Sequence, residues 1–203
     1  MKKIIFIGAG GYAKSAIDAL SLYNHNIEGF IDDYKEGKHL GYNILGKDID
    51  DIKTPKNYEY FISIGDNIKR KNWYDKLKNK GLNLINIVDP TAILSDNTQI
   101  GEGCFIGKMA IINSDVLIGN NCVINTKALV EHGCRIGNHV NISTNSVLNG
   151  DVNVKDGAFV GSCSVVNGQL CIGEKAMIGS GTVVIRDVES CSTVVGVPAR
   201  KIK

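Results

Sequence analysis

Residues 116–142 read VLIGNNCVINTKALVEHGCRIGNHVNI, and an aliphatic side chain returns at every sixth position of this stretch. The same spacing extends in both directions without a break, and two residues before each aliphatic lies a small side chain, with Leu170 as the exception. The aliphatic positions are Leu94, Ile100, Ile106, Ile112, Ile118, Ile124, Val130, Ile136, Ile142, Leu148, Val154, Val160, Val166, Ile172, Ile178 and Val184.

A period of six fits neither a continuous helix nor a flat strand, whose side chains repeat near 3.6 and at 2. It fits a short strand followed by a corner, with one bulky side chain pointing inward on each side of a triangular prism. Three sides make a coil of eighteen residues, and each coil pairs its backbone with the coils above and below. The sequence therefore predicts a parallel β-helix of roughly five coils. Gly or Asn often follows the aliphatic, and we expect these residues to take the left-handed backbone of the corners.

The N-terminal part of the chain has a different pattern, typical of a small α/β domain. We expect strands at residues 2–7, 27–31, 58–64 and 84–88, with one helix from the glycine-rich turn to about Leu22 and another through about Lys80. Strands that alternate with helices in this way predict a parallel sheet.

The turn after the first strand reads Gly8-Ala9-Gly10-Gly11-Tyr12-Ala13, and Asp32 follows about twenty residues later. Gly8-x-Gly10-x-x-Ala13 matches the dinucleotide fingerprint, in which small residues let a phosphate approach the N-terminus of a helix. A full dinucleotide fold needs two mononucleotide halves, however, and too few strands fit before Pro90. The turn is therefore interpreted as a site for a single nucleotide or nucleotide-sugar, with NAD binding and a purely structural turn as the alternatives.

Composition separates the two parts and excludes several classes of function. All seven Tyr and the single Trp precede Pro90, and the net charge of +2 comes without a basic run, which argues against nucleic acid as the main partner. Since no apolar stretch reaches membrane-spanning length, we expect a cytoplasmic protein without a membrane partner. Cys104, Cys122 and Cys134 occupy the small inward position, and no Cys-x-x-Cys occurs, so we expect reduced core cysteines and no metal site.

The repeat resembles that of the hexapeptide-repeat acyltransferases, and this resemblance implies a left-handed prism. The whole chain resembles the bacterial sugar-nucleotide acetyltransferases and the related sialic acid O-acetyltransferases. The resemblance implies a Rossmann-like nucleotide-sugar-binding domain at 1–88, a left-handed β-helix acyltransferase domain at 89–203, acetyl-CoA as cosubstrate and a homotrimer. It assigns the nucleotide of the sugar substrate to six residues of the first domain: Gly10, Gly11, Tyr12, Asp32, Asp33 and Gly65.

The same resemblance makes His132 the general base that takes the proton from the attacking sugar amine. Two positions depart from the family pattern: Gly133 stands where an acid usually follows the histidine, and Asn141 stands where a second histidine usually contacts the thioester. Glu131 should project to another face, so we expect a partner for His132 from a neighbouring subunit; the alternative is that His132 works with a weaker base strength. His139 is either a displaced contributor or an exposed wall residue, and His25 and His39 are expected to be solvated.

Acetyl-CoA is expected to run along the prism between two subunits. The residues that the resemblance assigns to it are Asn141, Ser162 and Ser180, with Arg186, Arg200 and Lys201 as candidate phosphate contacts.

The preferred function is therefore N-acetylation of a nucleotide-linked amino sugar, of the UDP-4-amino-4,6-dideoxy type, in bacterial glycan biosynthesis. Sialic or nonulosonic acid O-acetylation is the closest alternative. A non-catalytic trimeric binding protein is a third possibility, because Gly133 and Asn141 replace two family residues. A prism-shaped carbonic anhydrase is discarded, because only His132 and His139 lie in the prism and three zinc ligands are needed.

Overall fold

The computed structural model describes residues 3–21 and 26–203. The chain divides into two compact units, residues 1–87 and 88–203.

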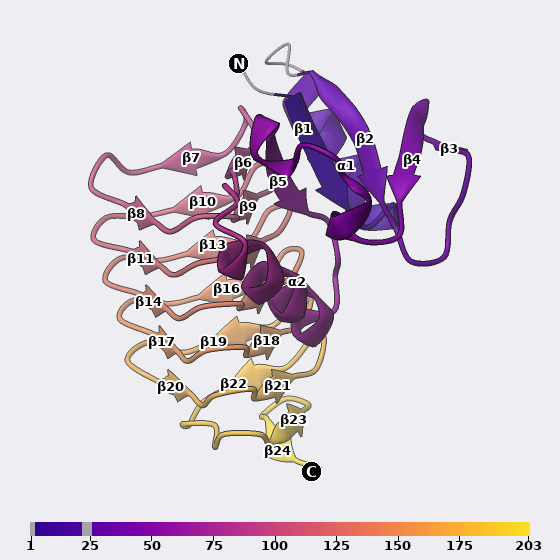
Figure 1. Cartoon of the computed structure of the whole chain (residues 1–203). Coiled ribbons are helices and arrows are strands. Elements are labelled where there is room, and N and C mark those ends of the chain that lie inside the picture. The colour runs from indigo at the N-terminus through magenta and orange to yellow at the C-terminus, as the bar shows by residue number, and fades with distance from the viewer. Residues whose placement is uncertain (1–2, 22–25) are drawn as a thin grey trace. The chain divides into compact units, whose positions relative to one another are not determined.

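The first unit is a Rossmann-like half-fold built on a five-stranded sheet with the order β3-β4-β2-β1-β5 (Figure 1). The strands β1 (Lys3–Ile7), β2 (Ile27–Ile31), β4 (Tyr42–Gly46) and β5 (Tyr58–Ile62) run parallel, and α1 (Gly11–Ser21) and α2 (Asn67–Asn79) are its helices. The expected strands at 2–7, 27–31 and 58–64 and both helices are present to within two residues. Phe6, Phe30 and Phe61 lie fully buried on the adjacent strands β1, β2 and β5.

A short hairpin in this unit was missed by the sequence interpretation. β3 (Lys38–His39) pairs antiparallel with β4 across Leu40 and Gly41, whose φ angles are 51° and 84°. Two consecutive left-handed residues make the tight turn of a two-residue hairpin, but Leu-Gly lacks the Asn-Gly or Asp-Gly signal that announces such turns. His39 was expected to be solvated; instead it packs edge-on against Phe30, with ring centroids 5.6 Å apart. His25 lies outside the described residues.

The strand expected at 84–88 was wrong as a single element. Leu84 forms an isolated parallel bridge with Tyr60, next to the first sheet. Ile87 and Val88 form β6 (Ile87–Val88), which belongs to a sheet of the repeat region instead. The apolar run is thus divided between two sheets, a split that hydrophobicity alone does not reveal.

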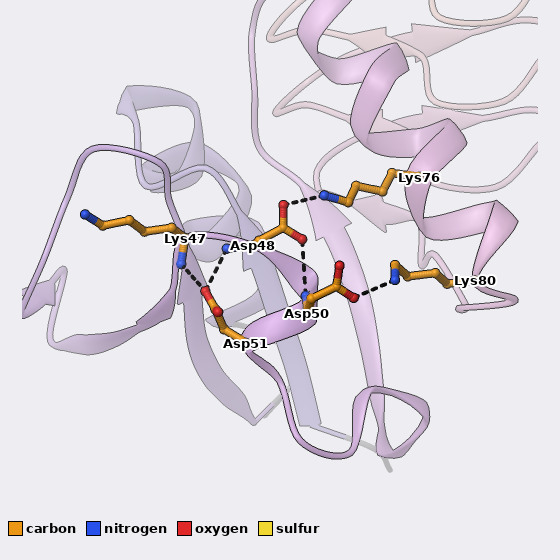
Figure 2. Close-up of polar contacts among 6 residues, drawn as sticks. All are labelled: Lys47, Asp48, Asp50, Asp51, Lys76 and Lys80. Atoms are coloured by element: carbon orange, nitrogen blue, oxygen red, sulfur yellow. Dashed lines mark hydrogen bonds and ion pairs between the residues drawn. The ribbon is translucent and has the colours of Figure 1, made fainter.

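Ion pairs fasten α2 to the segment that follows β4 (Figure 2). Asp48 pairs with Lys76 and Asp50 pairs with Lys80 at 2.5 Å. The Asp51 carboxylate accepts the backbone N–H groups of Lys47 and Asp48 at 2.8 and 3.0 Å, which closes the capping box of the short helix η1 (Ile49–Asp51). Exposed pairs of this kind stabilise little individually, and the burial of Leu77 in the core of this unit anchors α2.

The second unit is a left-handed parallel β-helix, as expected. Each of the sixteen aliphatic positions is the second residue of a two-residue strand, and the side chains from Ile106 to Val184 are buried. The strands are β7 (Ile93–Leu94), β8 (Gln99–Ile100), β9 (Phe105–Ile106), β10 (Ile111–Ile112), β11 (Leu117–Ile118), β12 (Val123–Ile124), β13 (Leu129–Val130), β14 (Arg135–Ile136), β15 (Asn141–Ile142), β16 (Val147–Leu148), β17 (Asn153–Val154), β18 (Phe159–Val160), β19 (Val165–Val166), β20 (Cys171–Ile172), β21 (Met177–Ile178) and β22 (Val183–Val184).

Every third strand stacks in one of three parallel sheets, ordered β22-β19-β16-β13-β10-β7, β20-β17-β14-β11-β8 and β24-β23-β21-β18-β15-β12-β9-β6 (Figure 1). The last of these is completed by β23 (Thr193–Val195) and by β24 (Arg200–Lys201), which pairs antiparallel with β23. Partners among β7 to β22 are eighteen residues apart, as in Ile112, Val130 and Leu148, whereas Ile178 of β21 pairs with Val194 of β23, sixteen residues later.

The role expected for the glycines after the aliphatic residues was wrong. The left-handed residues lie three positions after the aliphatic, at every sixth residue from Gly103 to Gly181, and include Lys127 and His139. The glycines directly after the aliphatic lie against the next coil. A Cβ on Gly119 would come within 2.8 Å of Gly137 O, and one on Gly161 within 2.6 Å of Ser180 N. These glycines are required by the close approach of two backbones, not by a special φ.

Replacing Gly161 with Ala should therefore destabilise the prism by about 1–3 kcal/mol, the usual cost of overpacking. The control is Gly181→Asn: Gly181 has φ 70° and open space around its Cα, and Asn145 adopts φ 58° in the equivalent turn. We expect this control to stay within about 1 kcal/mol of wild type, since Asn tolerates the left-handed region. Denaturant unfolding followed by far-UV circular dichroism measures both; equal losses would contradict the close-approach explanation.

Candidate active site

The glycine-rich turn lies at the carboxyl edge of the first sheet, where three strands end side by side. Gly8 has φ 92°, and a Cβ there would lie 3.3 Å from Ser63 O, so this turn packs directly on the end of β5. The Ser63 hydroxyl donates to Gly8 O at 2.5 Å. Gly10 and Gly11 are exposed, and a Cβ on either would meet nothing within 4 Å. The backbone at the start of α1 is thus open to a ligand, as anion sites at helix N-termini require.

The two acids after β2 have different environments. Asp32 Oδ2 accepts Ala9 N–H at 2.7 Å, and Oδ1 accepts the N–H groups of Tyr34 and Lys35 at 3.0 and 2.9 Å. Partial burial by itself raises the pKa of Asp32, but these three donors and the Lys35 charge outweigh it, and the pKa lies below its ordinary value. Asp32 therefore holds the glycine-rich turn against the loop after β2, whereas Asp33 is exposed.

Gly65 lies in the turn between β5 and α2, at the same edge of the sheet. It is exposed, and a Cβ there would meet nothing within 4 Å. The buried Arg70 guanidinium donates to Ile64 O and Gly65 O at 3.3 and 3.2 Å, and Asp66 caps α2 by accepting Lys69 N–H at 2.8 Å. Gly10, Gly11, Asp33 and Gly65 thus share one sheet edge, the usual ligand position in open α/β sheets.

Three residues that support this edge escaped the sequence interpretation. Ser63 donates a hydrogen bond to Gly8 O, Arg70 donates to Gly65 O, and Lys35 Nζ donates to Ala9 O. The sequence did not reveal the role of Arg70. Most residues of α2 are polar, so its buried face, which includes Arg70, is recognised only in the structure. Tyr12, an expected ligand residue, packs its ring against Phe61 with centroids 6.0 Å apart.

His132 lies in the turn that follows β13, with its side chain exposed. Its backbone N–H donates to the Glu131 carboxylate at 3.3 Å, so Glu131 contacts the histidine backbone. His139, in contrast, is buried at φ 59°, which removes its interpretation as an exposed wall residue. Its Nδ1 lies 2.9 Å from Asn121 Nδ2, and because an amide nitrogen only donates, Nδ1 accepts this bond.

The residues expected to contact acetyl-CoA lie on a different part of the prism. Asn141 is the outward residue of β15, is buried, and accepts the Ser143 hydroxyl at 3.3 Å. Ser162 and Ser180 are eighteen residues apart and stack in the corner that precedes β19 and β22. His132 lies in the corner that follows β13, in the same sheet. One chain therefore has the serines at one edge of a sheet and the histidine at the opposite edge.

One of the candidate phosphate contacts, Lys201, is paired with a carboxylate. Arg186, Arg200 and Lys201 line a cavity of about 440 Å³ at the C-terminal end of the prism. Lys201 pairs with Glu189 at 2.6 Å, and this bond holds the pKa of Glu189 below its ordinary value. Within residues 3–21 and 26–203, no group of three His, Cys, Asp or Glu side chains is placed to hold a metal ion, and no helix is long and apolar enough to cross a membrane.

A Rossmann-like half-fold followed by a left-handed β-helix with an exposed corner histidine defines the class of hexapeptide-repeat acyltransferases. Residues 3–77 match the family model of the PglD N-terminal domain, and residues 84–169 match that of the GMPPB C-terminal domain. PerB from Caulobacter crescentus, solved in complex with CoA and GDP-perosamine, is 31% identical with a TM-score of 0.93, over 100% of this chain and 98% of that chain. WeeI from Acinetobacter baumannii AYE is 28% identical with a TM-score of 0.92, over 100% of both chains.

The acetyltransferase domain of PglB from Neisseria gonorrhoeae, in complex with acetyl coenzyme A, shares the fold at 24% identity and a TM-score of 0.93, over 99% of both chains. The chain belongs to the bacterial sugar N-acetyltransferase family. It is an acetyltransferase by class.

The bonds of Asp32 lead to a pH-dependent prediction. Because the pKa of Asp32 in the folded protein lies below its ordinary value of 3.8, its carboxylate stabilises the fold above that pH and loses this effect as the pH falls through the folded-state pKa. Asp32→Asn should therefore lower stability at pH 7 by about 1–2 kcal/mol, with a smaller difference at pH 3. Urea unfolding followed by fluorescence of Trp73, the only tryptophan, measures this. Asp33→Asn is the control; an equal loss there would contradict the assignment.

Proposed function

We propose that this protein transfers the acetyl group of acetyl-CoA to the amine of a nucleotide-linked amino sugar. The observation that carries the proposal is the similarity over the full chain to PerB, whose structure contains CoA and GDP-perosamine. The open glycine-rich turn and the exposed His132 are consistent with two requirements of that reaction, binding of the nucleotide of the sugar acceptor and removal of the amine proton. Domain 1–88 is then the nucleotide-sugar-binding domain and 89–203 the acyltransferase domain.

In this mechanism the neutral sugar amine attacks the thioester carbonyl directly. The carbon–nitrogen bond forms, His132 accepts the ammonium proton as general base, and the tetrahedral intermediate collapses with departure of the CoA thiolate. Imidazole suits this step, since its ordinary pKa lies near working pH. Backbone N–H groups of the prism wall stabilise the oxyanion, and alignment of the two substrates lowers the barrier further.

The nucleotide sits, in this proposal, on Gly10, Gly11, Tyr12, Asp33 and Gly65. Asp32 acts mainly through the turn that it holds, because both of its oxygens already accept backbone N–H groups. A UDP-linked 4-amino-4,6-dideoxy sugar is the proposed substrate, and the GDP-linked sugar in PerB makes the guanine nucleotide its natural competitor. Asn141, Ser162 and Ser180 are the proposed acetyl-CoA contacts.

A homotrimer accounts for an apolar outer surface of the prism. It also accounts for the position of Ser162 and Ser180 at the opposite edge of the sheet from His132. The outward residues of β7, β10, β13, β16, β19 and β22 are all aliphatic and form what we call the apolar wall: Ile93, Ile111, Leu129, Val147, Val165 and Val183. Such a continuous apolar surface favours association. Because the wall has the serine corner at one edge and the His132 corner at the other, packing of walls between subunits supplies both corners to a shared site.

The catalytic assignment is tested with His132→Ala. CoA release with a panel of UDP-, dTDP- and GDP-linked 3-amino and 4-amino sugars should reveal one accepted sugar, and the variant should lose at least about 100-fold in kcat, the scale of a lost general base. Acceptance of a sialic acid instead of any amino sugar would favour the O-acetyltransferase alternative. No release with any acceptor would favour a binding protein.

Association is tested with Leu129→Glu, which places a charge at the centre of the apolar wall. Sedimentation should change from three times the chain mass of 21.9 kDa to a single chain, because burying an unpaired carboxylate is costly. Arg135→Glu, on the outward side of β14 in the neighbouring sheet, is the matched control and should remain trimeric. A trimer that persists in Leu129→Glu would reject this wall as the interface.

A further inference from the structure

The turn that holds His132 stacks on the turn eighteen residues later, and backbone hydrogen bonds fix the pair. Asp151 N–H donates to His132 O at 2.9 Å, and Gln169 N–H donates in turn to Gly150 O at 2.9 Å. The His132 ring lies directly on Gly150: a Cβ there would come within 2.6 Å of Cε1, 2.8 Å of Nε2 and 3.3 Å of Nδ1. The space for the imidazole therefore exists because residue 150 has no side chain.

The carboxylate of the next residue, Asp151, lies against Gly133. A Cβ built on Gly133 would overlap Asp151 Oδ1. The φ of Gly133, 70°, does not by itself demand glycine, because Asp115 and Asp151 adopt φ 61° in the equivalent turns of the neighbouring coils. Gly133 is thus required by the carboxylate that fills its side-chain space, and this space is where an acid following His132 would begin.

The other charged groups around this turn are already engaged. The Glu131 carboxylate accepts the backbone N–H of His132, and Asp115 Oδ1 accepts Asn97 Nδ2 at 2.6 Å. Arg135 donates to the backbone oxygen of Asp115 at 2.6 Å. Asp151 is exposed, and its Oδ1 lies beside Gly133, the residue that follows His132.

We propose that Asp151 is the positioning acid of His132, supplied from the following coil in place of an acid at residue 133. The His132 ring packs against Gly150, and the carboxylate belongs to the next residue, Asp151. The two groups therefore lie at the same turn of the prism. When His132 accepts the amine proton it becomes an imidazolium, and a neighbouring carboxylate stabilises that cation and selects which ring nitrogen carries the hydrogen beforehand. This role rests on the proposed function of His132 as base.

The test removes the carboxylate from residue 151 and places one at residue 133. Asp151→Asn should lower kcat by about tenfold, a part of the factor of roughly 10²–10⁴ that a general base contributes, with little change in KM for acetyl-CoA. Gly133→Asp alone should be impaired, because its side chain overlaps Asp151. The double variant Gly133→Asp/Asp151→Gly removes the overlap, returns a carboxylate to the turn and should recover most of the lost kcat. Asp115→Asn, in the preceding coil, is the matched control and should retain wild-type kcat.

A second measurement does not depend on turnover. Nitrogen-15 spectra of the His132 ring, assigned by comparison with His132→Gln, show which ring nitrogen carries the hydrogen; Asp151→Asn should turn one tautomer into a mixture. Unchanged spectra and unchanged kcat in Asp151→Asn would overturn the proposal, as would a double variant no better than Asp151→Asn. Changed spectra with unchanged kcat would keep Asp151 as the partner of the ring and reject His132 as the base.

Discussion

The backbone hydrogen bonds between adjacent coils are the interaction on which the repeat unit depends. Residues in and directly after each two-residue strand donate to one adjacent coil and accept from the other: Asn113 N–H, just after β10, reaches Val130 O, and Asn125 N–H, just after β12, reaches Ile142 O, both at 2.9 Å. No strand is long enough to be stable alone. The spacing of six follows from this stacking, because an aliphatic side chain must point inward once on each side of every coil.

The same stacking explains the geometry of the candidate site. Adjacent coils lie one strand spacing apart along the axis of the prism. A residue at a corner therefore always lies next to the corner residues of the coils above and below it. His132 therefore meets Gly150, and Gly133 meets Asp151. In the first unit the corresponding constraint is the sheet edge, where the turns after β1, β2 and β5 converge because parallel strands end together.

Much of the fold could be predicted from the sequence, because the repeat is read from one residue type at a fixed spacing. The three principal strands of the first unit and both helices also followed from apolar runs and a glycine-rich turn. The hairpin at β3 and β4 and the division of residues 84–88 did not, since their turn chemistry and pairing partners depend on three-dimensional neighbours. The role of the glycines after each aliphatic was misassigned for a related reason: close approach of two backbones leaves the same sequence signal as an unusual φ.

The site was predictable in part. The positions of Gly10, Gly11 and Gly65 at one edge follow from the order of strands and turns. Two features of the site were not predictable: only Asp32 of the acid pair holds the glycine-rich turn, and Ser63 and Arg70 bond to the backbone of the turns. Both depend on which side chains reach a backbone donor or acceptor in another part of the chain. His139 was ambiguous because alternation along a strand says nothing about side chains that project from corners.

The apolar wall has a consequence for how such a protein changes over generations. Each strand has one outward residue and one inward anchor, so the six outward residues of that sheet contribute nothing to the interior of the prism. Six codons, spaced fifty-four bases apart, thus determine whether the apolar wall is exposed to solvent or contacts another protein. Surface character and fold are inherited through separate positions, and a lineage can exchange its partners while its architecture stays untouched.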